Sequence, residues 1–102
     1  MKQNEILTYL KKIKPTFEKK GIATLGLFGS FAKHQESLTS DIDVIFKFKK
    51  SFFQNCDPWE YFNIINNLKD NISFHFKIKV DIFDEDSSSP YKTKIIKEAI
   101  YV

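Results

Sequence analysis

Two aspartates separated by one apolar residue carry the clearest chemical signal in this sequence. Asp41 and Asp43 alternate with apolar residues in the segment Asp41-Ile42-Asp43-Val44-Ile45-Phe46. Residues two apart on a β-strand share a face, so both carboxylates point the same way while Ile42 and Val44 point into a core. Adjacent carboxylates repel each other at neutral pH unless a cation lies between them. Mg²⁺ prefers hard oxygen ligands and often combines a few carboxylates with substrate phosphates, so the pair predicts a magnesium site.

A Gly-Ser pair ends the apolar run that precedes these aspartates. A strand that ends in Gly29-Ser30 and enters a helix presents free backbone N–H groups to an anion. Taken alone, the pair also fits an ordinary turn in which Ser30 caps the helix. Taken alone, Asp41 and Asp43 also fit carboxylates that cap or solvate a strand's edge. The combination on a strand–turn–helix–strand pattern favours a joint phosphate and metal site.

Gly29-Ser30-Phe31-Ala32-Lys33 and Ser40-Asp41-Ile42-Asp43-Val44 together resemble the signature of the DNA polymerase β superfamily of nucleotidyltransferases. The short chain most resembles the minimal nucleotidyltransferase (MNT) branch, which includes the MntA-like antitoxins of HEPN/MNT toxin–antitoxin pairs. This resemblance extends over most of the sequence. It implies an α+β (mixed α/β) fold, namely a polymerase β-like core with a small mixed sheet and helices mainly on one face.

The resemblance also implies which residues bind a nucleotide. Gly29, Ser30 and the adjacent amides would contact the β- and γ-phosphates of a nucleoside triphosphate, and Lys33 would place a positive charge nearby. Lys33 replaces the family's usual arginine, so the planar guanidinium fork is lost. His34 replaces the usual glycine, and we expect it to be an exposed helix residue.

A third carboxylate is expected on a neighbouring strand, and Asp81 fits because it lies opposite Val80 and Ile82. The resemblance gives Asp81 the role of metal ligand and helper in deprotonating the acceptor hydroxyl. The alternative for Asp81 is a solvated residue paired with a nearby lysine, and Asp84 is the competing third carboxylate. Asp41, Asp43 and Asp81 would then be the catalytic residues and would hold two Mg²⁺ ions about 4 Å apart.

The implied reaction moves AMP from ATP, the substrate, onto a hydroxyl, with a tyrosine of a partner HEPN toxin as acceptor. A non-catalytic antitoxin that neutralises its partner by contact remains the alternative, favoured by the lysine at position 33. Transfer to a small molecule is weaker, because enzymes that do so carry an extra domain to hold the acceptor.

Composition limits the other classes of function. The 102 residues predict a single domain over 1–102. No stretch approaches the ~20 apolar residues of a membrane span. The single cysteine, Cys56, excludes an internal disulfide and is typical of a cytoplasmic protein. The net charge of +3, from 16 lysines against 13 acidic residues and without arginine, does not indicate dedicated DNA binding. Both homo-oligomers and hetero-oligomers stay open.

Apolar periodicity predicts the elements that must position these residues. We expect a first helix over 4–20, kinked or restarted at Pro15, and a later helix that Asp57 caps. That later helix would bury Trp59, Phe62, Ile65 and Leu68 or their neighbours and end near Lys69, before a turn at Asp70-Asn71. The full expected order is helix 4–20, strand 22–28, helix 30–35, strand 41–48, a connection over 49–56, helix 58–69, strand 76–83, helix 90–99 and an edge strand over 100–102.

Overall fold

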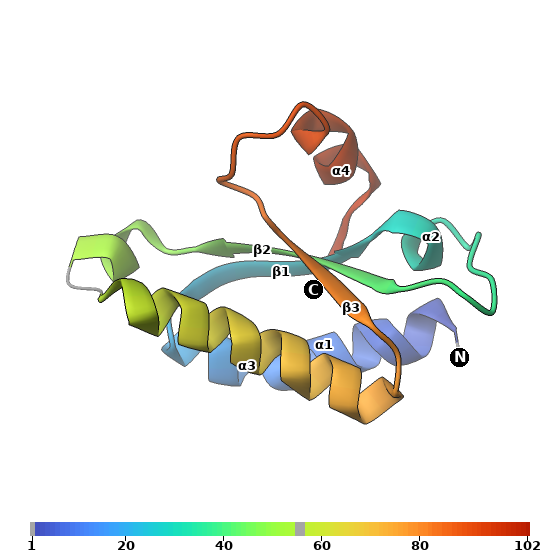
Figure 1. Ribbon diagram of the computed structural model, residues 1–102, viewed down its shortest axis with the longest axis horizontal. Coiled ribbons are helices and arrows are strands. Elements are labelled where there is room, and N and C mark those ends of the chain that lie inside the picture. Colours follow the sequence, from blue (N-terminus) through green and yellow to red (C-terminus); the bar gives the residue numbers. More distant parts are fainter. Residues whose placement is uncertain (1, 55–56) are drawn as a thin grey trace.

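Four strands form one mixed sheet in the order β3-β2-β1-β4. The computed structural model describes residues 2–54 and 57–102, so Cys56 lies outside the described residues. The strands are β1 (Ile22–Phe28), β2 (Ile42–Phe48), β3 (Val80–Asp84) and β4 (Ile100–Tyr101). β1 pairs antiparallel with β2 and with β4, whereas β2 and β3 are parallel. The predicted mixed α/β class is confirmed (Figure 1).

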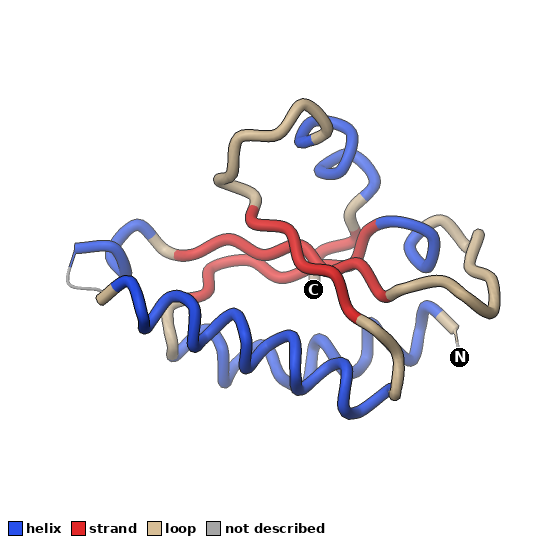
Figure 2. Tube along the Cα trace, in the orientation of Figure 1, coloured by secondary structure: helices blue, strands red, loops and turns tan. Residues whose placement is uncertain are grey.

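Helices lie on both sides of this sheet. The two long ones, α1 (Gln3–Lys19) and α3 (Pro58–Phe76), cover one face, and α4 (Lys92–Glu98) lies over the other (Figures 1 and 2). Two short helices, α2 (Gly29–Ala32) and the 3₁₀-helix η1 (Lys50–Gln54), follow β1 and β2. The prediction that helices lie mainly on one face therefore holds for the two long helices, α1 and α3.

The hydrophobic core fills the layer between the sheet and the two long helices. Its fully buried side chains come from α1, the three longer strands and α3, and include Ile6, Leu10, Phe17, Leu25, Leu27, Ile42, Val44, Phe46, Leu68, Ile72 and Val80. Ile45 points to the opposite side of β2 and is also completely buried. Part of the second face is therefore covered as well.

α1 runs without interruption through Pro15, so the predicted restart at this residue is wrong. A proline inside a helix removes one backbone hydrogen bond, the one that the carbonyl of Lys11 would accept. Lys11 is exposed, so solvent can satisfy that carbonyl. The burial of Ile6, Leu10 and Phe17 along one side outweighs the loss.

α3 is longer than predicted and is rotated relative to the prediction. It starts as expected, because the Asp57 side chain accepts a hydrogen bond of 2.9 Å from the Trp59 amide. It continues to Phe76, so the predicted turn at Asp70-Asn71 is wrong. Ile72 extends the buried row of Leu68 by one turn, and this burial outweighs the local turn preference of Asp and Asn.

The predicted burial of Trp59 and Phe62 is wrong, whereas that of Ile65 and Leu68 is confirmed. Trp59 is 75% exposed and Phe62 55% exposed. The residues that α3 buries are Ile64, Ile65, Leu68 and Ile72. Lys77, in the left-handed conformation at φ 59°, ends the helix. The strand predicted from residue 76 therefore starts only at Val80.

Within the described ranges, no helix is long and apolar enough to cross a membrane.

Candidate active site

Two of the three predicted carboxylates are direct neighbours in the sheet. Asp43 of β2 and Asp81 of β3 are paired in the parallel register. Paired residues on adjacent strands extend to the same face, so both carboxylates lie on the side away from α1 and α3. Asp41 immediately precedes β2. The sheet therefore brings the three carboxylates to one end of the β2–β3 pair.

The surroundings of Asp43 disfavour the negative charge of its carboxylate. Burial raises the pKa of Asp43 from 3.8 to about 6, with smaller contributions in the same direction from the charges of Asp81 and Asp41. The only cation paired with this group, among the described residues, is Lys79, whose Nζ lies 4.0 Å from Oδ2 of Asp41. An exposed ion pair of this length compensates little. The three neighbouring carboxylates of Asp41, Asp43 and Asp81 therefore favour the binding of an additional cation.

The turn after β1 touches the same carboxylate. Gly29 has φ +74°, in the left-handed region that favours glycine. A Cβ at position 29 would lie 2.9 Å from Cγ of Asp43 and would collide with its carboxylate oxygen. Only glycine therefore allows the backbone of the turn to lie directly against Asp43.

Ser30 does not cap the helix that it enters. α2 begins at Gly29, and its cap position is Phe28, without a side-chain capping bond. The first amides of a helix have no partner within it, so the amides of Gly29 and Ser30 are free of intrahelical bonds. The capping role offered as the alternative for Ser30 is not realised here.

Lys33 extends from the end of α2 to α4. Its Nζ lies 3.4 Å from Oε1 of Glu98, which is also 4.0 Å from Nζ of Lys94. Glu98 could not be identified from the sequence, because it lies 65 residues from Lys33. The lysine predicted to face phosphates is thus paired with a carboxylate in this structure.

His34 follows α2 in the left-handed conformation, with φ 56°. The helix therefore ends earlier than predicted, and His34 is an exposed residue beyond its end rather than within it. Glycine adopts this conformation without steric cost, and histidine adopts it more readily than most other residues. The histidine thus keeps the turn that a glycine would make at this position.

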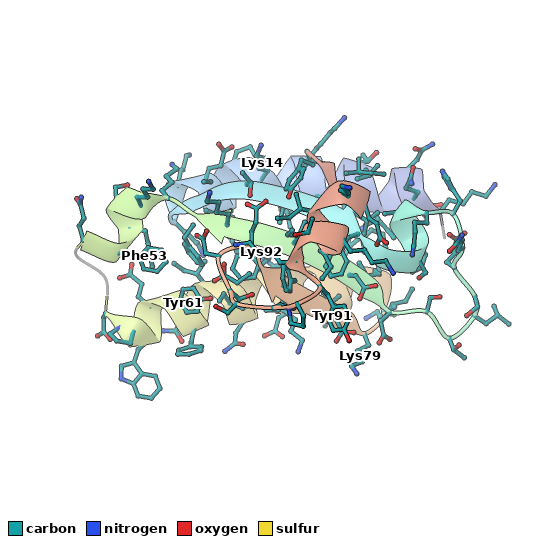
Figure 3. The ribbon with its side chains drawn as sticks, turned by 90° about the horizontal axis from the view of Figure 1, so that it is seen from above. Lys14, Phe53, Tyr61, Lys79, Tyr91 and Lys92 are labelled. Carbon is teal, nitrogen blue, oxygen red and sulfur yellow. The ribbon has the colours of Figure 1, made fainter. Side chains whose placement is uncertain are left out.

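Asp84 has a different role from the other carboxylates. It is in register with Phe46, a core residue, and so lies on the opposite side of β3 from Asp81. It accepts hydrogen bonds from the hydroxyl of Tyr61 at 2.5 Å and from the amide of Asp86 at 2.9 Å. Burial, followed by the bond to Asp84, raises the pKa of Tyr61 well above its usual range. The hydrogen bond between Asp84 and Tyr61 therefore joins β3 to α3. Figure 3 shows Tyr61 on α3 near Phe53 of η1.

Two aromatic rings that the sequence analysis did not select lie beside the carboxylates. Phe28 is in register with Asp43, and Phe83 follows Asp81 by two residues, so both belong to the same face. Their ring centroids are 6.1 Å apart in an edge-to-face arrangement. This pair provides an apolar surface next to the acidic group.

The donor atoms fit Mg²⁺ as one partner in a shared coordination shell. In the part of the chain that the structure describes, no three His, Cys, Asp or Glu side chains are arranged to hold one metal ion by themselves. Mg²⁺ usually keeps several waters and takes one or two carboxylates together with substrate phosphates. The neighbouring carboxylates of Asp43 and Asp81, with Asp41 beside them, match that requirement.

Comparisons with known proteins identify the family of this chain. The family model for polymerase β nucleotidyltransferases matches residues 11–102. Two relatives from Methanocaldococcus jannaschii, both named as candidate protein adenylyltransferases, are 36% and 31% identical to this chain. The alignments cover 96% and 97% of this chain and 92% and 96% of those relatives.

Solved structures show the same fold at low sequence identity. A candidate minimal nucleotidyltransferase matches with a TM-score of 0.71 and 19% identity, over 98% of this chain and 95% of that one. A toxin–antitoxin structure with AMP-PNP matches with a TM-score of 0.60 and 19% identity, over 99% of this chain and 72% of that one. With the family match over residues 11–102, we conclude that this chain belongs to the polymerase β family of nucleotidyltransferases.

Proposed function

We propose that this protein transfers AMP from ATP onto a hydroxyl of a partner protein in the cytoplasm, in a reaction that requires Mg²⁺. The observation that carries the proposal is the register of β2 and β3, which sets Asp43 beside Asp81 while Gly29 lies against Asp43. Carboxylates next to a backbone turn with free amides are what a metal-bound triphosphate needs.

The relatives support the type of acceptor. The Methanocaldococcus proteins are named as candidate enzymes that adenylylate proteins, and they match this chain over nearly its full length. One structural neighbour is a toxin–antitoxin complex with AMP-PNP. We therefore propose a tyrosine of a toxin of the HEPN class as the acceptor, with this chain as the antitoxin.

Asp41, Asp43 and Asp81 would hold Mg²⁺, in the two-ion form that the family resemblance implies. When bound, Mg²⁺ neutralises charge on the phosphates and lowers the pKa of the attacking hydroxyl. The chain's own contribution is to bind and to orient. The amides of Gly29 and Ser30 would donate to the phosphates, as backbone groups at a strand–helix turn do for anions.

The transfer requires one bond exchange at the α-phosphorus. The acceptor oxygen forms a bond to this phosphorus while the bond to the pyrophosphate oxygen breaks, and pyrophosphate leaves. Asp81, the exposed member of the carboxylate pair, is the group we assign to receive the hydroxyl proton. Lys33 would exchange Glu98 for the phosphates as its partner.

The test uses ATP labelled in the α-phosphate, Mg²⁺ and a co-expressed HEPN protein. We expect label on the partner with the natural sequence and none with Asp41→Asn/Asp43→Asn or with Asp81→Asn. Asp86→Asn, an exposed carboxylate in the loop after β3, is the matched control and should retain transfer. Transfer that survives the double substitution, or that never occurs with the natural sequence, would contradict the proposal.

The pairing of Lys33 with Glu98 favours a second candidate function, neutralisation of the partner by contact alone. A lysine that remains bound to Glu98 would not engage phosphates. Cells that express the partner together with the Asp41→Asn/Asp43→Asn variant distinguish the two functions. Retained protection means that contact suffices, whereas lost protection with an intact complex means that the transfer is required.

A further inference from the structure

The side of α3 that faces away from the core has the composition of a protein interface. Its three aromatic residues are largely exposed: Trp59 by 75%, Phe62 by 55% and Phe74 by 76%. Between them lie three exposed asparagines, Asn63, Asn66 and Asn67. We call these six residues, with Asp70, the outer face of α3.

Charge is depleted along the same helix. The chain contains 16 lysines, yet only one falls within the 19 residues of α3. Interface cores are enriched in aromatic residues and depleted in lysine and glutamate relative to the rest of a protein surface. Exposed aromatic side chains at both ends of one helix therefore indicate a surface that a partner covers.

We propose that a second copy of this chain covers the outer face of α3, with the two helices antiparallel about a two-fold axis. An axis that passes between Asn66 and Asn67 sets Trp59 opposite Phe74 of the second copy. It also sets Asn63 opposite Asp70. In a two-fold interface each of these contacts occurs twice, so the same face of α3 forms the interface in both copies.

A groove at the C-terminal end of α3 is large enough to take the exposed indole ring of Trp59 from the second copy. It has a volume of about 650 Å³ and is lined by residues that include Tyr9, Phe74, His75 and Lys77. The rings of Tyr9 and His75 stack in it at 4.0 Å, and Nζ of Lys77 lies 4.2 Å from the centroid of Phe74. In the antiparallel arrangement, Trp59 of each copy reaches this groove of the other.

The charges at the two ends of α3 select the antiparallel direction. Asp57 and Glu60 make the N-terminal end of α3 acidic. His75 and Lys77 make its C-terminal end basic. Antiparallel pairing brings the acidic end against the basic end and opposes the two helix dipoles. Parallel pairing would place like charges together and would keep Trp59 away from the groove. The face is thus complementary to itself in one orientation.

The available area is sufficient for a modest dimer. Aromatic side chains bury 150–250 Å² each, so the six rings of two copies contribute on the order of 700 Å² after allowance for their partial exposure. The asparagines and the groove bring the total near the ~1,000 Å² that a specific interface needs. α3 lies on one side of the sheet (Figure 1), whereas the strand register places Asp43 and Asp81 on the other face, so the inference does not depend on the proposed activity.

The chain has a single tryptophan, which makes Trp59 a direct probe of the interface. We expect sedimentation and light scattering to give the mass of a dimer that dissociates on dilution. Tryptophan emission should shift to longer wavelength over the same concentration range. Trp59→Ala/Phe74→Ala should give the monomer mass at every concentration, with an unchanged circular dichroism spectrum. Leu38→Ala, at a fully exposed apolar side chain outside α3, is the control and should still dimerise.

Cross-linking tests whether the two copies share the outer face of α3. In a Cys56→Ser background, Asn66→Cys/Asn67→Cys should form an intermolecular disulfide rapidly, whereas Lys11→Cys/Lys12→Cys on the exposed side of α1 should not. A monomer at all concentrations overturns the proposal. So do assemblies that grow beyond two copies, or a Trp59 that becomes protected only when a toxin partner is added.

Discussion

The repulsion around Asp43 leads to a prediction about stability that needs no activity assay. In the absence of metal, replacement of Asp43 by Asn should make the folded protein more stable at pH 8. The asparagine keeps the size and shape of the side chain but removes the charge that burial and the neighbouring carboxylates disfavour. A residue that the proposed function requires thus destabilises the protein without its ligand.

The pKa shift gives the sign and the size. The pKa of Asp43 is raised from 3.8 to about 6, so between these values the folded state binds more protons than the unfolded state. The free energy of unfolding therefore falls as pH rises through this window and stays lowered above pH 6. This rise in the pKa of Asp43 corresponds to a loss in the free energy of unfolding of at most about 3 kcal/mol. Solvent screening at this partly exposed carboxyl reduces the penalty to about 1–1.5 kcal/mol.

Thermal unfolding in chelator measures this difference. For a chain of this size, each kcal/mol shifts Tm by about 4–8 °C, so Asp43→Asn should unfold several degrees higher at pH 8. The gain should shrink towards zero near pH 4. Asp86→Asn, the exposed control, should change Tm little at either pH. An Asp43→Asn variant that is less stable than the natural protein at pH 8, or equally stable, would refute the repulsion argument. Added ATP and Mg²⁺ should stabilise the natural protein and not the variant.

Three further substitutions follow from single contacts. Gly29→Ala adds a Cβ at a left-handed residue and against the carboxylate of Asp43, so we expect a loss of about 1–3 kcal/mol in denaturant unfolding and weaker nucleotide binding. Glu98→Gln releases Lys33 from an ion pair worth up to about 1 kcal/mol, so calorimetry should show ATP binding two- to five-fold tighter. Asp57→Ala removes the cap of α3 and should cost about 1 kcal/mol, without any change in ATP affinity.

The limits of sequence-based prediction are clearest at α3 and β3. The start of α3 was predictable because Asp57 and Pro58 act locally, through a cap and a fixed φ. Its end was not, because Asp and Asn favour turns locally while Ile72 packs into the distant sheet. The error at the end of the helix also moved the predicted start of the strand from Val80 to residue 76. Tertiary packing overrode local preference at this point.

The candidate site was predictable where it depends on alternation within a strand. Asp43 and Asp81 each follow a buried residue by one position, and β2–β3 register then makes them neighbours. The partner of Lys33 was not predictable, because the position of Glu98 depends on how α4 lies over the sheet. The left-handed turn at His34 was also missed, since only the backbone reveals it.

The core and the candidate site are coupled through the register of β2. Ile42, Val44 and Phe46 are at most 1% exposed on one side of this strand, while Asp43 lies on the other. A shift of one residue would turn every side chain of β2 to the opposite face and would bury Asp43 in the core. The apolar burial that excludes this shift therefore also fixes Asp43 against Gly29 and beside Asp81, although charge repulsion opposes that placement. The hydrophobic face of β2 thus supplies the free energy that keeps the carboxylates of Asp43 and Asp81 together against their mutual repulsion.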